Sequence, residues 1–438
     1  MTPEGQVREE IATRIYQRAE EIASRALRPL ERPRPAWDEG LDALLTSRWL
    51  GFPVMFGLLG LVLWLTIVGA NYPSELLATG LFWLEGKLSQ LLLALGAPAW
   101  VHGLLVFGVY RAVAWVVAVM LPPMAIFFPL FSLLEDLGYL PRVAFNLDRL
   151  FKAAGAHGKQ ALTMCMGFGC NAAGVTSCRI IDSPRERLVA VLTNTFVPCN
   201  GRFPLLITLA ILFMGRSSVM AAAVVAGTVL LGVAVSLTVS WALSRTLLRG
   251  TPGGFALELP PYRWPQVGRV LVRSFLDRTA FVLARAVTLA APAGAIIWLL
   301  GNTSVQGASL LSHAAYLLDP LGRALGMDGF ILLAFLLALP ANELVIPIML
   351  MGYLSAGTMV ELNGLEALGT ILTERGWSWL TALSVMLFSL LHYPCGTTLL
   401  TIYRETGRVG WALLGALIPL SVATLVCYGI NALAHILS

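Results

Sequence analysis

Charged residues are scarce in this sequence. Asp, Glu, Lys and Arg make up 13% of its 438 residues, whereas 57% are hydrophobic. Soluble domains average about 25% charged residues, so the composition excludes an ordinary soluble protein and indicates a polytopic membrane protein. The net charge of +5 comes from Lys and Arg scattered along the chain, which is not a nucleic-acid-binding pattern. We therefore expect membrane lipid, and no nucleic acid, as a partner.

Motifs for nucleotide hydrolysis and for secretion are also missing. The sequence contains no G-x-x-x-x-G-K-[ST] motif, so we expect a transporter without GTPase motifs in this chain, not an enzyme. The first residues alternate in charge without a hydrophobic region, which argues against a signal peptide. The cysteines lie in or beside apolar segments, which argues against a secreted disulfide framework; they are Cys165, Cys170, Cys178, Cys199, Cys395 and Cys427.

Long apolar stretches are what the sequence does have. A crossing needs roughly 20 apolar residues, and the stretches present, several interrupted by Pro or Gly, predict about eight to ten crossings. They cover 52–70, 112–134, 204–215 with 218–244, 279–300, 329–354, 377–392 and 409–436. Arginines cluster in 8–34 and 245–278, which the positive-inside rule places in the cytoplasm together with the N-terminus.

The chain divides into four parts. Isoleucines at helical spacing predict an amphipathic helix over 5–28, followed by a Pro-rich linker, and 74–95 mixes charges into leucines and is expected to be interfacial. The predicted parts are an N-terminal cytoplasmic helix and linker, a first membrane half, a cytoplasmic connecting segment and a second membrane half. Their bounds are 1–36, 37–250, 251–278 and 279–438.

The two membrane halves share a weak duplication. In the first, GFGCN (167–171) precedes NTFVPCNGRFPLLITLAILFMGR (194–216); in the second, LPANELVIP (339–347) precedes SLLHYPCGTTLLTIYRETGR (389–408). Paired hydrophobic segments broken by Pro or Gly indicate a transport site at the interface of two repeats. Chance similarity between two oily segments is the alternative.

Each half contains a Pro-Cys pair, at Cys199 and at Cys395. A proline inside a hydrophobic segment leaves a backbone carbonyl without its helical partner, and in lipid that group needs protein, water or an ion. A cysteine beside each break adds a polarizable sulfur. A kink with a small neighbour is the plainer interpretation, but two matching pairs favour a functional one.

Asn342 and Glu343 lie inside FLLALPANELVIPIMLMGYL, far from any basic residue in the sequence. Burying an isolated carboxylate is costly, so Glu343 is expected to face a cavity and to be protonated or compensated by a cation. The structural alternative is a hydrogen bond to a neighbouring helix, or a pair with a distant arginine such as Arg179 or Arg202.

The stretch MGFGCNAAGVTSCRII (166–181) places Cys170 and Asn171 at a glycine-rich break. Thiolate, amide and carboxylate ligands together suit a divalent first-row metal, and thiolate argues against Mg²⁺ and Ca²⁺. The predicted metal-contacting residues are Cys170, Cys199, Cys395, Asn171, Asn342 and Glu343. Cys165, Cys178 and Cys427 are expected to be core residues, and His392 is left open between ligand and packing.

From about residue 46 to 436 the sequence resembles the membrane domain of the FeoB ferrous-iron transporters of bacteria. The similar stretches include SLLEDLGYLPRVAFNLDRLFKAAGAHGKQALTMCMGFGCN, LPANELVIPIML and HYPCGTTLLTIYRETG, in the family's order. The resemblance implies an all-α polytopic helical membrane protein with two Gate-type pseudo-repeats containing broken helices. It also implies Fe²⁺ transport across the bacterial inner membrane, with Cys170, Cys199 and Cys395 lining the path and no permanently bound cofactor.

Two departures from the family's pattern leave alternatives open. FeoB proteins begin with a GTP-binding domain, so a separate GTPase chain or a small cytoplasmic accessory protein is an expected partner, as is a second copy of this chain. CNAAGVTSCR differs from the family's usual run, which leaves Mn²⁺ as a competing ion. A nucleoside-type solute carrier and a non-transporting partner of a GTPase-bearing FeoB are the other functions considered.

Overall fold

The computed structural model describes residues 3–26, 36–47, 49–214, 218–249, 262–360 and 364–437. Regular structure in these ranges is helical, as predicted, except for one short hairpin in which β1 (Ser304–Val305) pairs antiparallel with β2 (Ala308–Ser309). The hairpin's two turn residues, Gln306 and Gly307, both have positive φ, as a two-residue hairpin turn requires.

The N-terminal part contains α1 (Pro3–Ala26) and α2 (Ala36–Leu45). The first is the predicted amphipathic helix, and its Ile11, Ile15 and Ile22 are more than half exposed. Most of the predicted Pro-rich linker lies outside the described residues. Asp42 of α2 accepts hydrogen bonds from the buried guanidinium of Arg142 and from Tyr262, which ties α2 to two later segments.

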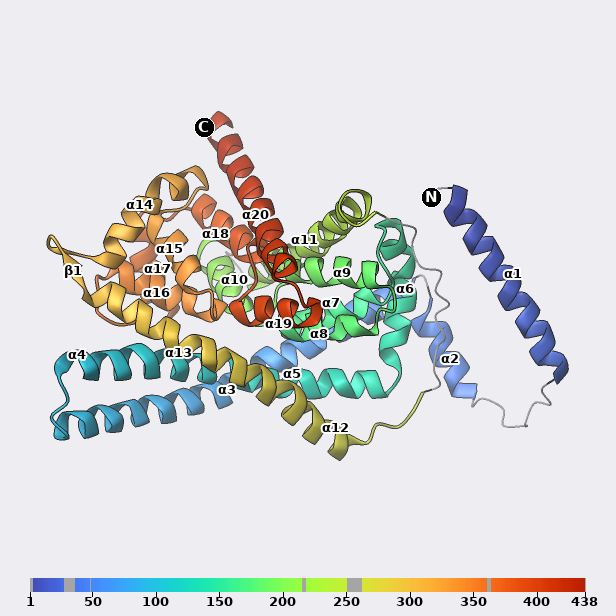
Figure 1. Ribbon diagram of the computed structural model, residues 1–438, viewed down its shortest axis with the longest axis horizontal. Helices are drawn as coiled ribbons and strands as arrows, with labels where there is room; N and C mark the ends of the chain where they lie inside the picture. Colours follow the sequence, from blue (N-terminus) through green and yellow to red (C-terminus); the bar gives the residue numbers. More distant parts are fainter. Residues whose placement is uncertain are drawn as a thin grey trace.

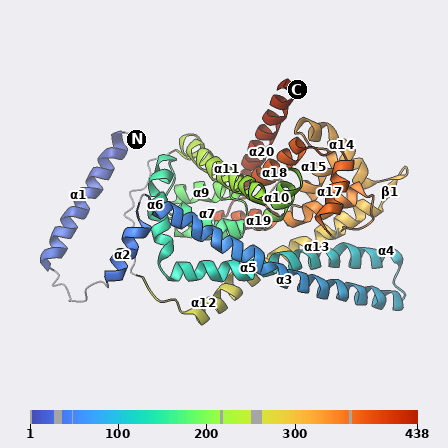
Figure 2. The same ribbon diagram turned by 180° about the vertical axis from the view of Figure 1, so that it is seen from behind.

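A long helical hairpin forms one side of the molecule (Figures 1 and 2). It consists of α3 (Gly51–Ala94), about 66 Å long at 1.5 Å per residue, and the returning stretch α4 (Ala99–His102), η1 (Gly103–Tyr110) and α5 (Arg111–Asp136). The expectation of a separate interfacial segment over 74–95 is wrong, because α3 continues through it. Glu85 is tolerated there because Arg111 binds its carboxylate at 2.5 and 3.1 Å.

The rest of the first half is a series of shorter helices. They are α6 (Tyr139–Ala153), α7 (Gln160–Gly169), α8 (Asn171–Ser177), η2 (Cys178–Ile180), α9 (Pro184–Thr193), η3 (Asn194–Phe196), α10 (Phe203–Leu209), η4 (Ala210–Met214) and the long α11 (Ser218–Arg245).

The second half repeats this alternation of long and short helices. It contains α12 (Val267–Arg273), η5 (Ser274–Ala280), α13 (Phe281–Asn302), α14 (Leu310–Ala324), α15 (Gly329–Leu337), η6 (Asn342–Leu344), α16 (Val345–Tyr353), α17 (Leu365–Glu374), α18 (Trp379–Leu391), α19 (Gly396–Thr406) and α20 (Val409–Leu437).

Corresponding breaks interrupt the short helices of the two halves. The α7–α8 break at Cys170 matches the α15–η6 break at Ala341, because both residues have φ −155° and ψ 125° and each precedes an asparagine that begins the next helix. The breaks before α10 and α19 both contain a Pro-Cys pair. The predicted duplication is thus a repetition of backbone conformation as well as of residues.

Six described helices are long and apolar enough to cross a membrane, or seven if the bent pair Leu310–Ala324 and Gly329–Leu337, at 109°, counts as one. This number of long helices is lower than the predicted eight to ten crossings, and the difference lies in 204–215 and 329–354, which form short or broken helices. On the long helices, large apolar side chains such as Trp64, Leu425 and Tyr428 are exposed, as lipid contact requires. The molecule is a multi-pass helical membrane protein.

Candidate functional site

All four helix breaks border one small cavity, which we call the inner chamber. Its volume is about 30 Å³, and it is lined by Met120, Met124, Gly169, Cys170, Asn171, Cys199, Asn200, Gly201, Pro340, Ala341, Asn342, Glu343 and Cys395. The structure therefore brings together all six residues that the sequence singled out, although they lie up to 225 positions apart. The two methionines, which come from α5, were not predicted from the sequence.

Backbone hydrogen bonds hold the breaks against one another in pairs. In the first half, the N–H of Asn200 donates to the carbonyl of Gly169 at 3.4 Å; in the second, the N–H of Gly396 donates to the carbonyl of Leu339 at 2.6 Å. In each case the residue that follows a Pro-Cys pair donates to a carbonyl one or two residues before the other break of its half. The cavity walls are consequently built from non-helical backbone that protein groups satisfy.

The two halves present different side chains at matching positions. The first half contributes Cys170 and Asn171, where the second contributes Ala341 and Asn342, with Glu343 next in the chain. Hydrogen bonding orients the Asn171 amide so that its nitrogen donates to the carbonyls of Gly167 and Val197, both at 3.2 Å. At this pair of breaks the two halves share an asparagine and differ in the thiol and the carboxylate.

The three thiols lie in unequal surroundings. Cys170 and Cys199 are buried, whereas Cys395 is half-buried and lies 3.3 Å from the Thr398 hydroxyl. The Asn342 amide nitrogen lies 3.9 Å from the Cys199 sulfur. Among the described residues no group of three or more His, Cys, Asp or Glu is close enough to hold one metal ion. In this conformation the thiols are lining groups, not members of a closed coordination shell.

Arg202 joins the two Pro-Cys breaks. Its guanidinium is fully buried and donates to the carbonyl oxygens of Thr195, Leu390, His392 and Tyr393 at 2.7 to 3.3 Å. Four carbonyls from both halves thereby gain a charge-assisted partner in a buried place. This arginine was considered as a partner for Glu343, but the structure places its donors on the backbone instead.

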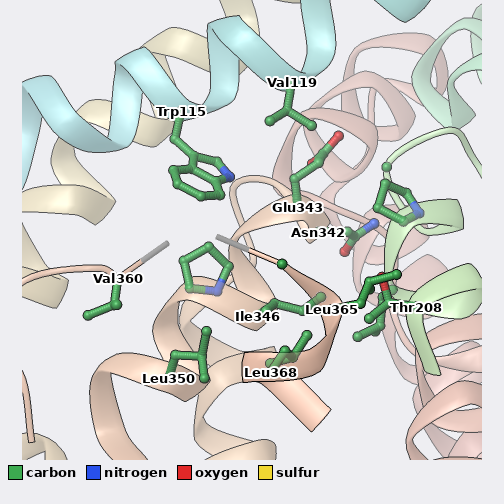
Figure 3. Close-up of a pocket in the computed structure, with 15 residues that line it drawn as sticks. Trp115, Val119, Thr208, Asn342, Glu343, Ile346, Leu350, Val360, Leu365 and Leu368 are labelled. Carbon is green, nitrogen blue, oxygen red and sulfur yellow. The ribbon is translucent and has the colours of Figure 1, made fainter. Parts of the chain in front are cut away.

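Glu343 lies where the inner chamber meets a larger cavity, the vestibule. The vestibule has a volume of about 350 Å³ and is lined by Trp115, Val119, Gly201, Pro204, Leu205, Thr208, Asn342, Glu343, Ile346, Pro347, Leu350, Val360, Gly364, Leu365 and Leu368. Figure 3 shows Trp115 and Val119 reaching from α5 toward Glu343 and Asn342. Both cavities share Gly201, Asn342 and Glu343, which we call the constriction.

The constriction is tightly packed on the Gly201 side. A Cβ atom added at Gly201 would overlap the Glu343 carboxylate. In the described part of the chain no basic side chain pairs with this carboxylate, and Arg179, the other candidate, binds Glu405 instead at 2.7 Å. The structure therefore leaves the Glu343 carboxylate between two cavities without a protein cation.

His392 and the remaining cysteines lie away from both linings. The His392 ring stacks on Phe388 with centroids 5.5 Å apart, and its Nδ1 lies 2.9 Å from the Ser389 carbonyl, so it belongs to an aromatic cluster. Cys178 donates to the Gly174 carbonyl and Cys427 to the Ser384 carbonyl, both in buried surroundings. These contacts agree with the prediction that the two thiols are core residues.

Outside the membrane-spanning helices, polar contacts fasten the loops around α7 and α8. The Lys159 ammonium binds Asp182 at 3.0 Å and lowers the pKa of that carboxyl group. His157 is buried, its Nδ1 accepts a hydrogen bond from the backbone N–H of Lys159, and burial lowers its pKa. These contacts place the loop before α7 against the loop after α8.

Comparison with known proteins identifies two family regions. Residues 117–213 and 283–409, together about half of the chain, match the Gate family, described as "Nucleoside recognition". Residues 225–277 match the family described as "Ferrous iron transport protein B C terminus". The two Gate segments contain all four helix breaks.

Several relatives resemble the chain over most of its length. The "Fe(2+) transporter FeoB" of Staphylococcus aureus (strain MSSA476) is 27% identical over 90% of this chain and 59% of its own length. The protein of the same description from Methanocaldococcus jannaschii is 27% identical over 91% and 59%. A "Fe(2+) transport protein A/Fe(2+) transporter FeoB fusion protein" of Porphyromonas gingivalis is 26% identical over 89% and 50%. The chain thus spans between half and three fifths of the length of these relatives.

Proposed function

The chain belongs to the Gate family and corresponds to the membrane part of the FeoB proteins, and from this premise we propose that it conducts Fe²⁺ across a membrane through the vestibule and the inner chamber. The observation that carries the proposal is the convergence of four helix breaks on one cavity lined by three thiols, three asparagines and Glu343. Such a donor set suits a divalent first-row metal ion.

The two cavities suit successive stages of hydration. The vestibule, at about 350 Å³, has room for on the order of ten water molecules at about 30 Å³ each, which is enough for an ion with its hydration shell. The inner chamber, at about 30 Å³, holds one or two at most. We expect the ion to exchange water for protein donors at the constriction, where Glu343 compensates its charge. Several weak contacts in sequence would let it leave again.

The basic segments favour one orientation. α2, α6 and α12 lie at the same end of the molecule, whereas β1, α4 and α17 lie at the other (Figures 1 and 2). The positive-inside rule places the end with α2 and α12 in the cytoplasm of a bacterial cell, with the protein in the inner membrane. The vestibule is lined in part by α17, which lies toward the opposite end (Figures 1 and 2), so the ion would enter from outside the cell.

A GTPase and a small accessory protein are the partners we propose. One relative combines a "Fe(2+) transport protein A" with the transporter in a single chain. The end formed by α2, α6 and Tyr262 is held together by Asp42 and Arg142 and is the proposed place for coupling to such domains. Co-purification with a GTPase-bearing chain, without ion flux by this chain alone, would favour a regulatory role instead.

A feature of the vestibule supports a second candidate function, a carrier of nucleoside-like solutes. Trp115, Thr208 and Asn342 line it together, and its volume falls in the range of small-molecule sites, about 300–1,000 Å³. An aromatic wall with amide and hydroxyl groups is what a nucleoside would need. A rise in the thermal unfolding midpoint with nucleosides, and with no metal ion, would favour this candidate.

The test of iron transport is uptake into proteoliposomes. The purified chain should take up Fe²⁺, with Mn²⁺ and Zn²⁺ measured in parallel, and Cys199→Ser and Cys395→Ser should each slow uptake. Cys427→Ser is the matched control, since this thiol is buried against the Ser384 carbonyl and lines neither cavity. Unchanged Fe²⁺ flux in both chamber variants would exclude the thiol-lined path.

A further inference from the structure

The helix α5 brings two thioether groups to the inner chamber. Met120 and Met124 both line it, four residues apart and therefore on one face of the helix. Met124 is 3% exposed and Met120 is partly buried. Both methionines lie outside the duplicated segments α7–α10 and α15–α19, which contain the breaks. The helix α5 therefore adds a chamber wall that is not part of the duplication.

Two prolines lie between these methionines. Pro122 and Pro123 have no N–H, so the carbonyls of Ala118 and Val119 lose their usual helical partners. Val119 itself lines the vestibule. α5 remains helical over Arg111–Asp136, unlike the broken helices of the other chamber walls, but its prolines leave backbone carbonyls near the two methionines without helical partners.

The chamber is consequently rich in sulfur. Three thiols and two thioethers surround a space of about 30 Å³, in which an ion has little room for water. Thiolate and thioether ligands select soft cations such as Cu⁺, whereas carboxylate and carbonyl oxygens suit harder ones. Glu343 is the one carboxylate of the lining, and it lies at the constriction between the chamber and the vestibule.

We propose that Met120 and Met124, together with the chamber thiols, form a subsite for a soft monovalent cation, Cu⁺ or its analogue Ag⁺. An ion held there occupies a chamber too small for a second ion and blocks the path. Binding follows from the cavity and its donors alone, whereas the block of iron flux rests on the proposed function. Methionine also fills space in protein cores, so the sulfur atoms themselves have to be tested.

The binding experiment uses the full chain purified in detergent and titrated with Ag⁺ against a competing chelator. Met120→Leu/Met124→Leu keeps side-chain volume and removes both sulfurs, and we expect its Ag⁺ affinity to fall about tenfold or more, by analogy with the loss of metal-site groups. Met349→Leu/Met351→Leu is the matched control, because these methionines are buried and line neither cavity. Its affinity should stay within about twofold of the parent.

A spectroscopic measurement separates ligation from packing. X-ray absorption of the Cu⁺-loaded protein should show fewer sulfur neighbours in Met120→Leu/Met124→Leu than in the parent, and an unchanged number in the control. Equal affinities and equal sulfur counts in the parent and both double variants would overturn the subsite.

The flux experiment distinguishes this proposal from the proposed function. Ag⁺ should inhibit Fe²⁺ uptake by the parent, and Met120→Leu/Met124→Leu should need about tenfold more Ag⁺ for the same inhibition. Absence of Fe²⁺ uptake in the parent, with methionine-dependent Ag⁺ binding intact, would overturn iron transport and leave the subsite standing. Fe²⁺ uptake with the same Ag⁺ sensitivity in all variants would overturn the subsite and leave iron transport standing.

Discussion

Replacing Gly201 with alanine adds one methyl group at the constriction between the vestibule and the inner chamber. The new Cβ would overlap the Glu343 carboxylate, with Oε1 as the nearest atom and Cδ 2.6 Å away, against an ordinary contact of 3.4 Å, so the carboxylate has to move by about 1 Å. Gly201 has no positive φ, so alanine does not strain its backbone. The atom it meets is the end of a flexible side chain, and overpacking should therefore cost only about 1 kcal/mol of folding free energy.

The effect on transport should be larger than the effect on folding. A methyl group is similar in size to a water molecule, and the inner chamber has room for only one or two of these. We expect Fe²⁺ uptake into proteoliposomes to fall at least about tenfold, which corresponds to about 1.4 kcal/mol on the barrier. Gly227→Ala is the control, because a Cβ at that helical glycine meets no atom within 4 Å.

A double-mutant cycle tests whether the loss of Fe²⁺ uptake in Gly201→Ala depends on the Glu343 carboxylate. If Gly201→Ala acts by displacing Glu343, then adding it to Glu343→Ala should slow uptake little further, giving a clear interaction term. Parental flux in Gly201→Ala, or losses that simply add in the double variant, would refute the constriction as the narrow point of the path.

Three further predictions concern groups around the path. Arg202→Met leaves four carbonyls unpaired, so the free energy of unfolding should fall by at least about 3 kcal/mol. Arg202→Lys should lie between this variant and the parent. A thermal unfolding midpoint of Arg202→Met equal to the parent's would contradict the prediction. Glu405→Gln removes the bidentate pair that joins Arg179 of η2 to Glu405 of α19 and so ties the first half to the second. Ion leak should therefore rise, while the unfolding midpoint should hardly move because a partly exposed pair is worth less than about 1 kcal/mol. The swapped pair Arg179→Glu/Glu405→Arg should restore the parent's leak, and a swap as leaky as Glu405→Gln would contradict this role of the pair. Burial lowers the pKa of His157, so the folded state binds a proton at this residue less tightly than the unfolded chain does. Stability should therefore fall as the pH drops below about 6.5. Thermal melts from pH 7.5 to 5 should show that the unfolding midpoint of His157→Gln depends less on pH than the parent's, and the same pH dependence in both proteins would contradict this.

The sequence located the helix breaks better than it located the ends of the long helices. Proline and glycine inside apolar segments are local signals, so the breaks at Cys170, Cys199, Asn342 and Cys395 could be located without a structure. Each break also needs tertiary partners, and these were not visible in the sequence. The role of Arg202 is the clearest example, because its four acceptors are backbone carbonyls that only folding brings together.

Long helices were predicted less well because their boundaries depend on pairing between helices. Glu85 marked 74–95 as interfacial in the sequence, but Arg111 on the neighbouring helix neutralises it, and α3 continues unbroken. Met120 and Met124 were overlooked because methionine in an apolar run looks like any other core residue. Their i, i+4 spacing around Pro122-Pro123 is the signal that could have found them.

The identical backbone angles of Cys170 and Ala341 have a consequence for the protein's conformational states. In a protein built from two equivalent inverted halves, the outward-open and inward-open forms are exchanged by the internal symmetry and would have equal free energies. Here the same conformation carries a thiol in one half and a methyl group in the other, and a carboxylate follows only in the second. If the two halves of this chain exchange conformations during transport, these side-chain differences would give the two forms unequal free energies even before an ion or a partner binds.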